Sequence, residues 1–177
     1  MESDFWKNGL SFACKRCSAC CRHDPGFVFL SAHDISRLLS ATGFPFREFI
    51  DKFVKPVDIG TGTMLSLREK KNNDCIFWGD SGCEVYSERP LQCSTYPFWP
   101  NILKSESSWH EESGDCPGIK GGSIVSAEAI ADCLLSRRLH PALILSYDQQ
   151  WEHLNEDAIL GSSRIDTHAT DAGEAQK

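Results

Sequence analysis

The stretch FACKRCSACCRHDPG, residues 12–26, places four cysteines within eight positions: Cys14, Cys17, Cys20 and Cys21. A C-x-x-C spacing lets two thiolates from one tight turn reach the same metal ion at a small cost in chain entropy. The stretch offers that spacing twice in succession and then ends on an adjacent pair. Neighbouring side chains diverge, so Cys20 and Cys21 are expected to face different ways. The pair is therefore interpreted as a junction between two metal centres, or between one centre and a structural tie.

Five more cysteines follow, and four of them fall in or beside predicted loops and short strands. The exception is Cys133, which lies among apolar residues of a predicted helix, where a free cysteine behaves as a small hydrophobe. Three cysteines in register plus four distant ones indicate a metal site, whereas a lone C-x-x-C is shared with redox pairs. The eight candidate metal ligands are Cys14, Cys17, Cys20, Cys21, Cys75, Cys83, Cys93 and Cys116.

Eight thiolates divide into two sets of four. The spacing C-x2-C-x2-C, completed by a remote Cys-Pro, resembles the iron–sulfur ligation of ferredoxins. One predicted set is therefore Cys14, Cys17, Cys20 and Cys116, and the other is Cys21, Cys75, Cys83 and Cys93.

The identity of the metal stays open, because zinc and iron–sulfur clusters suit all-thiolate sites about equally. Zinc, iron and a [4Fe-4S] cluster are all retained as cofactors. A zinc ion held by four thiolates carries a net charge of about −2. Lys15, Arg16 and Arg22 lie among the ligands and either offset that charge or are solvated surface bases. His23 is a candidate replacement ligand, although a loop histidine beside such a site more often does not bind the metal.

Charge and terminal sequence bear on partners and compartment. The net charge is −7, which argues against a nucleic-acid partner. The N-terminus, MESDFWKNGLSF, is acidic where a signal peptide is basic, and no apolar run approaches the roughly 20 residues of a membrane span. We expect a cytoplasmic protein that contacts no membrane and whose partners are a metal ion and an unidentified protein. In a reducing compartment, nine cysteines favour metal binding over disulfides.

Helices are predicted over 31–43, 45–56 and 126–140 from capping residues and apolar periodicity. A last helix is expected to begin at Pro141 and to carry Trp151.

Short runs between Met64 and Tyr86, separated by turn residues, predict an antiparallel meander. A further strand is expected around Trp109, within 101–113, and the segment GDCPGIKGG is expected to be a loop.

The predicted fold class is α+β: one small domain of helices with a short antiparallel hairpin or meander, and loops tied together by cysteine-ligated metal. The expected division of the chain is an N-terminal lead-in (1–11), a cysteine-cluster metal-binding domain (12–122), C-terminal helices packed on it (123–160) and a disordered tail (161–177).

The chain resembles the YkgJ-type cysteine-cluster proteins, a zinc- or iron-chelating family with the signature CxxCxxCC. CKRCSACC (14–21) matches the signature, DCIFWGDSGCEVYSERPLQCSTYPF (74–98) resembles the family's second block, and DCPGIKGG (115–122) its last element. The helical segment between the first and second blocks is similar as well. One departure is Ser18, which stands where the family often has glycine. The resemblance implies metal chelation and leaves the chemistry open.

Three functions follow from the residues and the resemblance. The first is a protein that holds zinc, iron or an iron–sulfur cluster and has a redox, metal-handling or accessory role. The second is an enzyme component, because a related cysteine cluster occurs in flagellin lysine N-methylases. The third is a purely structural zinc adaptor module. Whether the chain is an enzyme is left open, and no catalytic residue is named. Arg89 either stabilises a cluster's negative charge or stiffens a turn.

Overall fold

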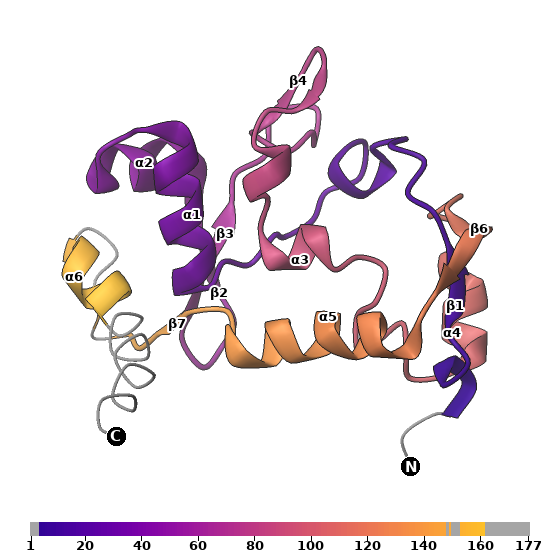
Figure 1. Ribbon diagram of the computed structural model, residues 1–177. Helices are drawn as coiled ribbons and strands as arrows, with labels where there is room; N and C mark the ends of the chain where they lie inside the picture. The colour runs from indigo at the N-terminus through magenta and orange to yellow at the C-terminus, as the bar shows by residue number, and fades with distance from the viewer. Residues whose placement is uncertain (1–3, 148, 150–152, 162–177) are drawn as a thin grey trace, which may run out of the picture.

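The computed structural model describes residues 4–147, 149 and 153–161, and shows an α+β domain with small antiparallel sheets (Figure 1). In chain order the elements, with 3-10 helices marked η, are η1 (Asp4–Trp6), β1 (Leu10–Phe12), η2 (Ala19–Cys21), α1 (Ala32–Thr42), α2 (Phe46–Phe53), β2 (Val54–Asp58), β3 (Thr63–Leu67), β4 (Trp78–Gly79), β5 (Gly82–Cys83), η3 (Tyr86–Glu88), α3 (Leu91–Ser94), α4 (Glu106–Glu112), β6 (Ile119–Val125), α5 (Ala127–Leu139), β7 (Ile144–Leu145) and α6 (Glu156–Leu160). The predicted α+β class is confirmed.

Helix α1 begins and ends as its sequence predicts. The Ser31 side chain accepts a hydrogen bond from the Asp34 backbone, and the Asp34 side chain accepts one from the Ser31 backbone, which makes a capping box. At the other end Gly43 adopts a left-handed conformation with φ 69°, which glycine tolerates without strain. These local signals fix the helix because each satisfies terminal backbone groups that the helix itself cannot pair.

Helix α2 is shorter than predicted. It ends at Phe53, and Val54 already begins strand β2 instead of continuing the apolar face of the helix. The strand pairs antiparallel with β3, in a register that sets Val54 opposite Leu67. Because β2 is the outer strand of the order β2-β3-β7, its Pro56 is tolerated at the sheet edge.

The predicted meander is only partly right: β3 falls in its first run, β4 and β5 overlap the other two runs only at Trp78 and Cys83, and the pairing differs. Strand β3 pairs with β2 and β7, whereas β4 and β5 form a separate two-stranded hairpin. An isolated bridge between Glu69 and Cys75 is the only strand-type link that the described residues show between β3's continuation and the hairpin segment. Strand β2, one partner of β3, begins within residues predicted as the end of a helix. The local sequence pattern therefore did not reveal this pairing.

Three other predictions are corrected. The expected strand around Trp109 is helix α4, capped by Ser105, with Trp109 buried on its inner face. The expected loop GDCPGIKGG runs into β6, which pairs with β1. The residues after Pro141 form β7, not a helix, and α6 begins only at Glu156. Trp151 and the tail 162–177 lie outside the described residues.

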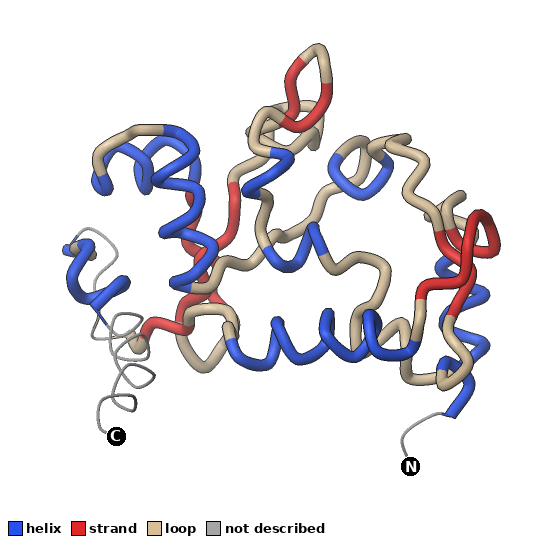
Figure 2. The backbone as a smooth tube through the Cα atoms, viewed as in Figure 1, coloured by secondary structure: helices blue, strands red, loops and turns tan. Residues whose placement is uncertain are grey.

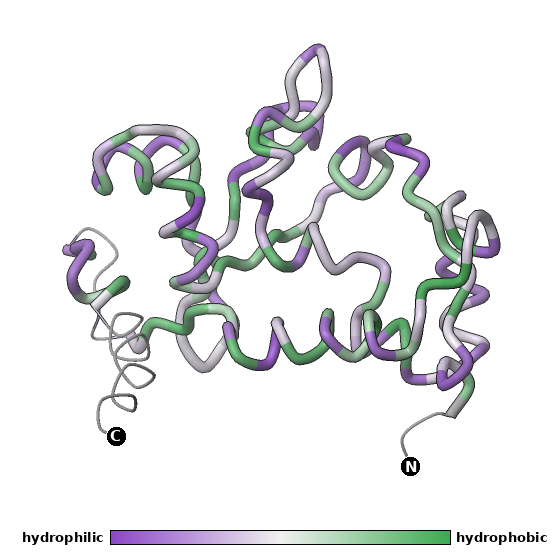
Figure 3. The backbone as a smooth tube through the Cα atoms, viewed as in Figure 1, coloured by the Kyte–Doolittle hydropathy of each residue, from purple (hydrophilic) through white to green (hydrophobic). Residues whose placement is uncertain are grey.

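Two apolar clusters hold the domain, one at each end of the view in Figure 1. The first, here called the α1–α2 cluster, packs α1 and α2 against β2 and β3, with Phe49, Ile35 and Leu65 fully buried. The second, the β1–β6 cluster, lies beside β1, β6 and α4 and buries Trp109 and Ile130. Helix α5 runs between the two ends, and hydrophobic positions alternate with hydrophilic ones along it (Figure 3).

Most of the chain between the two clusters is loop, interrupted by short elements such as α3 and the β4–β5 hairpin (Figure 2). Helix α5 spans this region, whereas the segments that carry the ligand cysteines are short or irregular; Cys75 and Cys83 pack against the α1–α2 cluster, and Cys116 belongs to the β1–β6 cluster. Within the part of the chain that the structure describes, no helix is long and apolar enough to cross a membrane.

Candidate metal centre

All eight predicted ligand cysteines are free thiols, as is Cys133. They lie on short or irregular elements. Cys14 and Cys17 follow β1, Cys20 and Cys21 end η2, Cys75 precedes the β4–β5 hairpin, Cys83 ends β5, Cys93 lies on α3, and Cys116 lies between α4 and β6.

Backbone hydrogen bonds bring the first cysteine block to the second. The N–H of Cys75 donates to the carbonyl oxygen of Cys21 at 2.9 Å. The N–H of Trp78 in turn donates to the carbonyl of Cys75, also at 2.9 Å, and Trp78 pairs with Cys83 in the hairpin. Three sequence-distant cysteines are thereby drawn into one neighbourhood.

We name the five cysteines of this neighbourhood the central thiol group: Cys20, Cys21, Cys75, Cys83 and Cys93. The sulfurs of Cys20 and Cys21 are 3.9 Å apart, within hydrogen-bonding distance. The pKa of Cys93 is raised, first by burial and then by the charges of Cys75, Cys20 and Cys83. Thiols from four chain segments therefore act electrostatically on one another.

The central thiols differ in how readily they ionise. The hydrogen bond from Cys21 lowers the pKa of Cys20 to about 7, and the same bond raises the pKa of Cys21. Burial raises the pKa of Cys75 to about 11 and also raises that of Cys83. Each further thiolate is disfavoured by the charges already present, and a bound cation would remove that penalty.

Backbone N–H groups face two of these sulfurs. Phe77 and Val85 each follow a cysteine by two positions, and their N–H groups lower the pKa of Cys75 and Cys83 against the larger effect of burial. A donor that hydrogen-bonds the charged form of a group stabilises that form. The turns that follow Cys75 and Cys83 therefore favour the thiolate forms of these two cysteines.

The remaining three ligands form what we name the edge thiol group: Cys14, Cys17 and Cys116. The N–H of Ala13 donates to the carbonyl of Gly118 at 3.1 Å, so the backbone at Cys14 runs beside the Cys116–Pro117 turn. Burial raises the pKa of Cys116 and the charge of Cys17 adds to the increase.

Two backbone donors face the Cys116 sulfur. The N–H groups of Gly118 and Ile119 act against burial and lower the pKa of Cys116. Tyr96 O–H donates to Glu112 Oε1 at 2.6 Å, so the hydroxyl lies between a carboxylate and a sulfur. The edge thiol group thus has a hydrogen-bonded polar pair beside it.

This arrangement differs from the predicted partition at Cys20, which lies with the central thiol group and not with Cys116. The adjacent pair also does not diverge as extended backbone would require. Residues 19–21 form a 3-10 helix, in which consecutive side chains are closer than on a strand. The turn enters this helix through Ser18, whose φ of 67° is a left-handed conformation that favours glycine.

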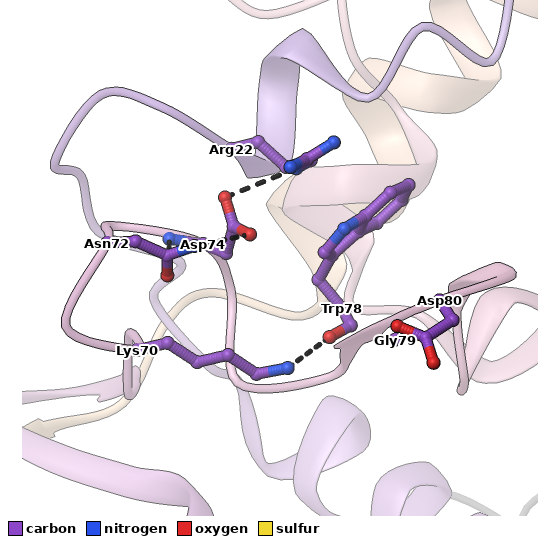
Figure 4. Close-up of a pocket in the computed structure, with 7 residues that line it drawn as sticks. All are labelled: Arg22, Lys70, Asn72, Asp74, Trp78, Gly79 and Asp80. Atoms are coloured by element: carbon purple, nitrogen blue, oxygen red, sulfur yellow. Dashed lines mark hydrogen bonds and ion pairs between the residues drawn. The ribbon is translucent and has the colours of Figure 1, made fainter.

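Charged and aromatic side chains lie close to Cys21 and Cys75 in the sequence and contact one another. Arg22 lies 3.2 Å from Asp74 and 5.0 Å from the centre of the Trp78 ring. Burial raises the pKa of Asp74, but Arg22, Asn72 and a backbone N–H outweigh it and hold the pKa below its usual range. Figure 4 shows these residues along an open hollow of about 360 Å³, with Lys70 donating to the carbonyl of Trp78.

Arg89 stiffens a turn, and its charge also acts on two thiols. It donates to the carbonyl of Tyr86 at 2.6 Å and lies over the Tyr86 ring, which stiffens the turn. Its charge also lowers the pKa of Cys20 and Cys83, in each case after larger effects. His23 is exposed, and its carbonyl accepts from Asn73.

One contact has no sequence signal. The rings of His33 and His140 stack with centroids 4.3 Å apart, although 107 positions separate them.

Among the described residues, no three His, Cys, Asp or Glu side chains are placed so that they could hold one metal ion.

Residues 13–117 match a family model described as "CxxCxxCC: Putative zinc- or iron-chelating domain", which covers more than half of the chain. A curated relative is "Uncharacterized protein MJ0661" of Methanocaldococcus jannaschii, 26% identical over 100 residues, or 55% of this chain and 50% of that protein. The chain therefore spans about half the length of the curated relative it matches. No solved structure matches the chain.

Proposed function

The chain belongs to the CxxCxxCC family of zinc- or iron-chelating domains, and on that premise we propose that the central and edge thiol groups are its metal ligands. One observation carries the proposal: the thiols of residues 20–21, 75, 83 and 93 lie near enough for their charges to act on one another, and all of them are free. The metal would join the loops between the two apolar clusters. The protein's role is redox, metal handling or accessory work.

The chemistry of the donor set fits a soft or borderline metal. Thiolates suit zinc, iron and iron–sulfur clusters, whereas magnesium and calcium take oxygen ligands. Metal binding requires each coordinating thiol to release its proton. The cations Arg16, Arg22 and Arg89 stand near or among the ligands and would reduce the resulting negative charge. Zinc, iron and a [4Fe-4S] cluster remain the proposed cofactors, and free thiols suit a reducing compartment such as the cytosol.

The test is anaerobic purification of the full chain, followed by counts of zinc, iron and acid-labile sulfide per chain and an absorption spectrum. Iron with sulfide and a brown colour would identify a cluster protein, and zinc alone a colourless one. C93S should lower the metal count, whereas C133S should not, because burial and the charge of Asp132, not another thiol, raise the pKa of Cys133. A metal count near zero in the wild type, or one unchanged by C93S, would overturn the proposal.

A second candidate, an enzyme component, is favoured by the edge thiol group. It has three cysteines, and the Tyr96–Glu112 pair lies beside one of them. Structural zinc sites have four protein ligands, whereas catalytic zinc sites keep one position open. Protein loaded with cobalt(II) distinguishes the two: added cyanide should change the absorption spectrum if a position is open. An unchanged spectrum would favour the structural adaptor instead.

A further inference from the structure

Arg137 is a half-buried arginine in the last turns of α5, beyond the residues that match the family. Its guanidinium lies 5.3 Å from the centre of the Trp99 ring. Its Nη1 atom is buried and has no hydrogen-bond partner among the described residues. Since a buried donor without a partner is costly, the nitrogen is placed to meet an acceptor that these residues do not supply.

The surroundings of Arg137 identify where that acceptor lies. Helix α5 packs against α3, and Trp99 Nε1 donates to the carbonyl of Gln92, the residue before Cys93. Burial lowers the pKa of Arg137, and the charges of Asp34 and Cys93 act in the opposite direction. These two groups, from α1 and α3, are the anionic groups that act on the guanidinium.

Asp34 is already occupied. Its carboxylate accepts hydrogen bonds from the Ser31 N–H at 2.9 Å, the Ser31 hydroxyl at 2.6 Å and the Leu91 N–H at 2.8 Å. These bonds hold it in the α1 capping box and at the start of α3. Among the described residues no hydrogen bond to the Cys93 sulfur is found, and Cys93 lies on α3, the helix against which α5 packs. Cys93 is therefore the group toward which the charge of Arg137 is available.

We propose that Arg137 is the charge partner of the metal–thiolate centre around Cys93, and that α5 thereby extends the metal site beyond the matched family region. The inference rests on the proposed function. When thiols release their protons and bind a divalent ion, four thiolates leave a net charge of about −2 on the centre. A guanidinium stays protonated, presents several donors in a fixed plane and is held in place here by Trp99.

The simpler alternative is that Arg137 only interacts favourably with the dipole at the C-terminus of α5 and with the Trp99 ring. Arg138 provides the matched control, because it is the next residue of the same turn, has the same charge and is exposed. Its distance from the helix end is nearly the same, so a helix-dipole effect should act on both residues.

The experiment is chelator competition for zinc(II), and separately for iron(II) without oxygen, on the full chain. R137Q should weaken metal affinity by about 10-fold, the lower end of the loss expected when a group supporting a ligand is removed. R137K, which keeps the charge, should recover most of that loss, and R138Q should match the wild type. Metal-free circular dichroism of each variant checks that it is folded.

Two kinds of failure are distinguishable. If the wild type binds no metal, or C93S keeps its full metal count, the proposed function fails. If those controls behave as expected but R137Q binds like R138Q, the role of Arg137 is overturned. Equal losses in R137K and R137Q would also overturn it, because they would trace to the Trp99 packing that both variants lose.

Discussion

The backbone N–H of Cys75 donates to the carbonyl oxygen of Cys21 at 2.9 Å, which joins two cysteine blocks that lie 54 positions apart. Cys75 packs against the α1–α2 cluster, whereas Cys21 ends the short 3-10 helix η2. Because both blocks lie on short or irregular elements, the thiols and whatever they bind are expected to control the order of these segments.

Metal removal should therefore loosen the first cysteine block before the α1–α2 cluster. We expect a chelator to speed tryptic cleavage after Lys15, Arg16 and Arg22, because site formation and local folding are coupled. Arg47 and Lys52 on α2 serve as internal references, since their helix buries its other face in the α1–α2 cluster. Mass spectrometry of timed digests provides the measurement. Unchanged protection of the first block after complete metal removal would contradict the prediction.

Single serine substitutions should sort the ligands by group. C20S and C93S are expected to remove the same centre, because both cysteines belong to the central thiol group. C116S should reduce the edge centre and leave the central one in place. Metal and sulfide counts of the three variants, with C133S as control, are the measurement. If C20S instead resembled C116S, the predicted sequence partition would be right and the structural grouping wrong.

Asp34 should contribute more to the free energy of unfolding than an ordinary helix cap does. It is 3% exposed and joins the N-terminus of α1 to that of α3 through Leu91. D34A leaves two buried donors and one half-buried donor without their acceptor, so we expect a loss of about 2–4 kcal/mol in the free energy of unfolding. S126A, which removes the exposed cap of α5, should cost about 1 kcal/mol. Urea unfolding of both variants, with equal metal content, tests the difference, and equal losses would contradict it.

Glu69 should contribute stability that depends on pH. It accepts hydrogen bonds from Lys55 Nζ and the Gly26 N–H, each at 2.7 Å. Burial raises its pKa, but these donors outweigh burial and hold the pKa below the usual 4.5. A carboxyl with a lowered folded-state pKa stabilises the fold above its unfolded pKa, and the contribution is lost as pH falls through the folded value.

E69Q is accordingly expected to lower stability by about 0.5–1 kcal/mol at pH 7 and by much less at pH 3.5. The wild type and the variant are compared by urea unfolding at each pH, so that effects of acid on bound metal are common to both. E48Q, which alters an exposed carboxyl of α2, is the control. A difference of the same size at both pH values would rule out ionisation of Glu69 as its cause.

The sequence by itself determined the features that depend on neighbouring residues. Ser31, Asp34 and Gly43 define the ends of α1 because a cap acts within four positions of the backbone groups that it satisfies. The α+β class and the family followed from periodicity and from the order of the cysteine blocks.

Only the tertiary structure decided which distant segments meet. Strand β2 follows α2 without a break and is recognisable only through its pairing with β3, and Trp109 lies on a helix where its neighbours suggested a strand. Cys20 belongs to the central thiol group because it lies in a 3-10 helix, which follows Ser18 and brings the Cys20 side chain close to that of Cys21. Arg137 lies near α3, the helix that carries Cys93, only because α5 packs against it. These contacts depend on how the two apolar clusters position the loops between them, and no local pattern of residues encodes that.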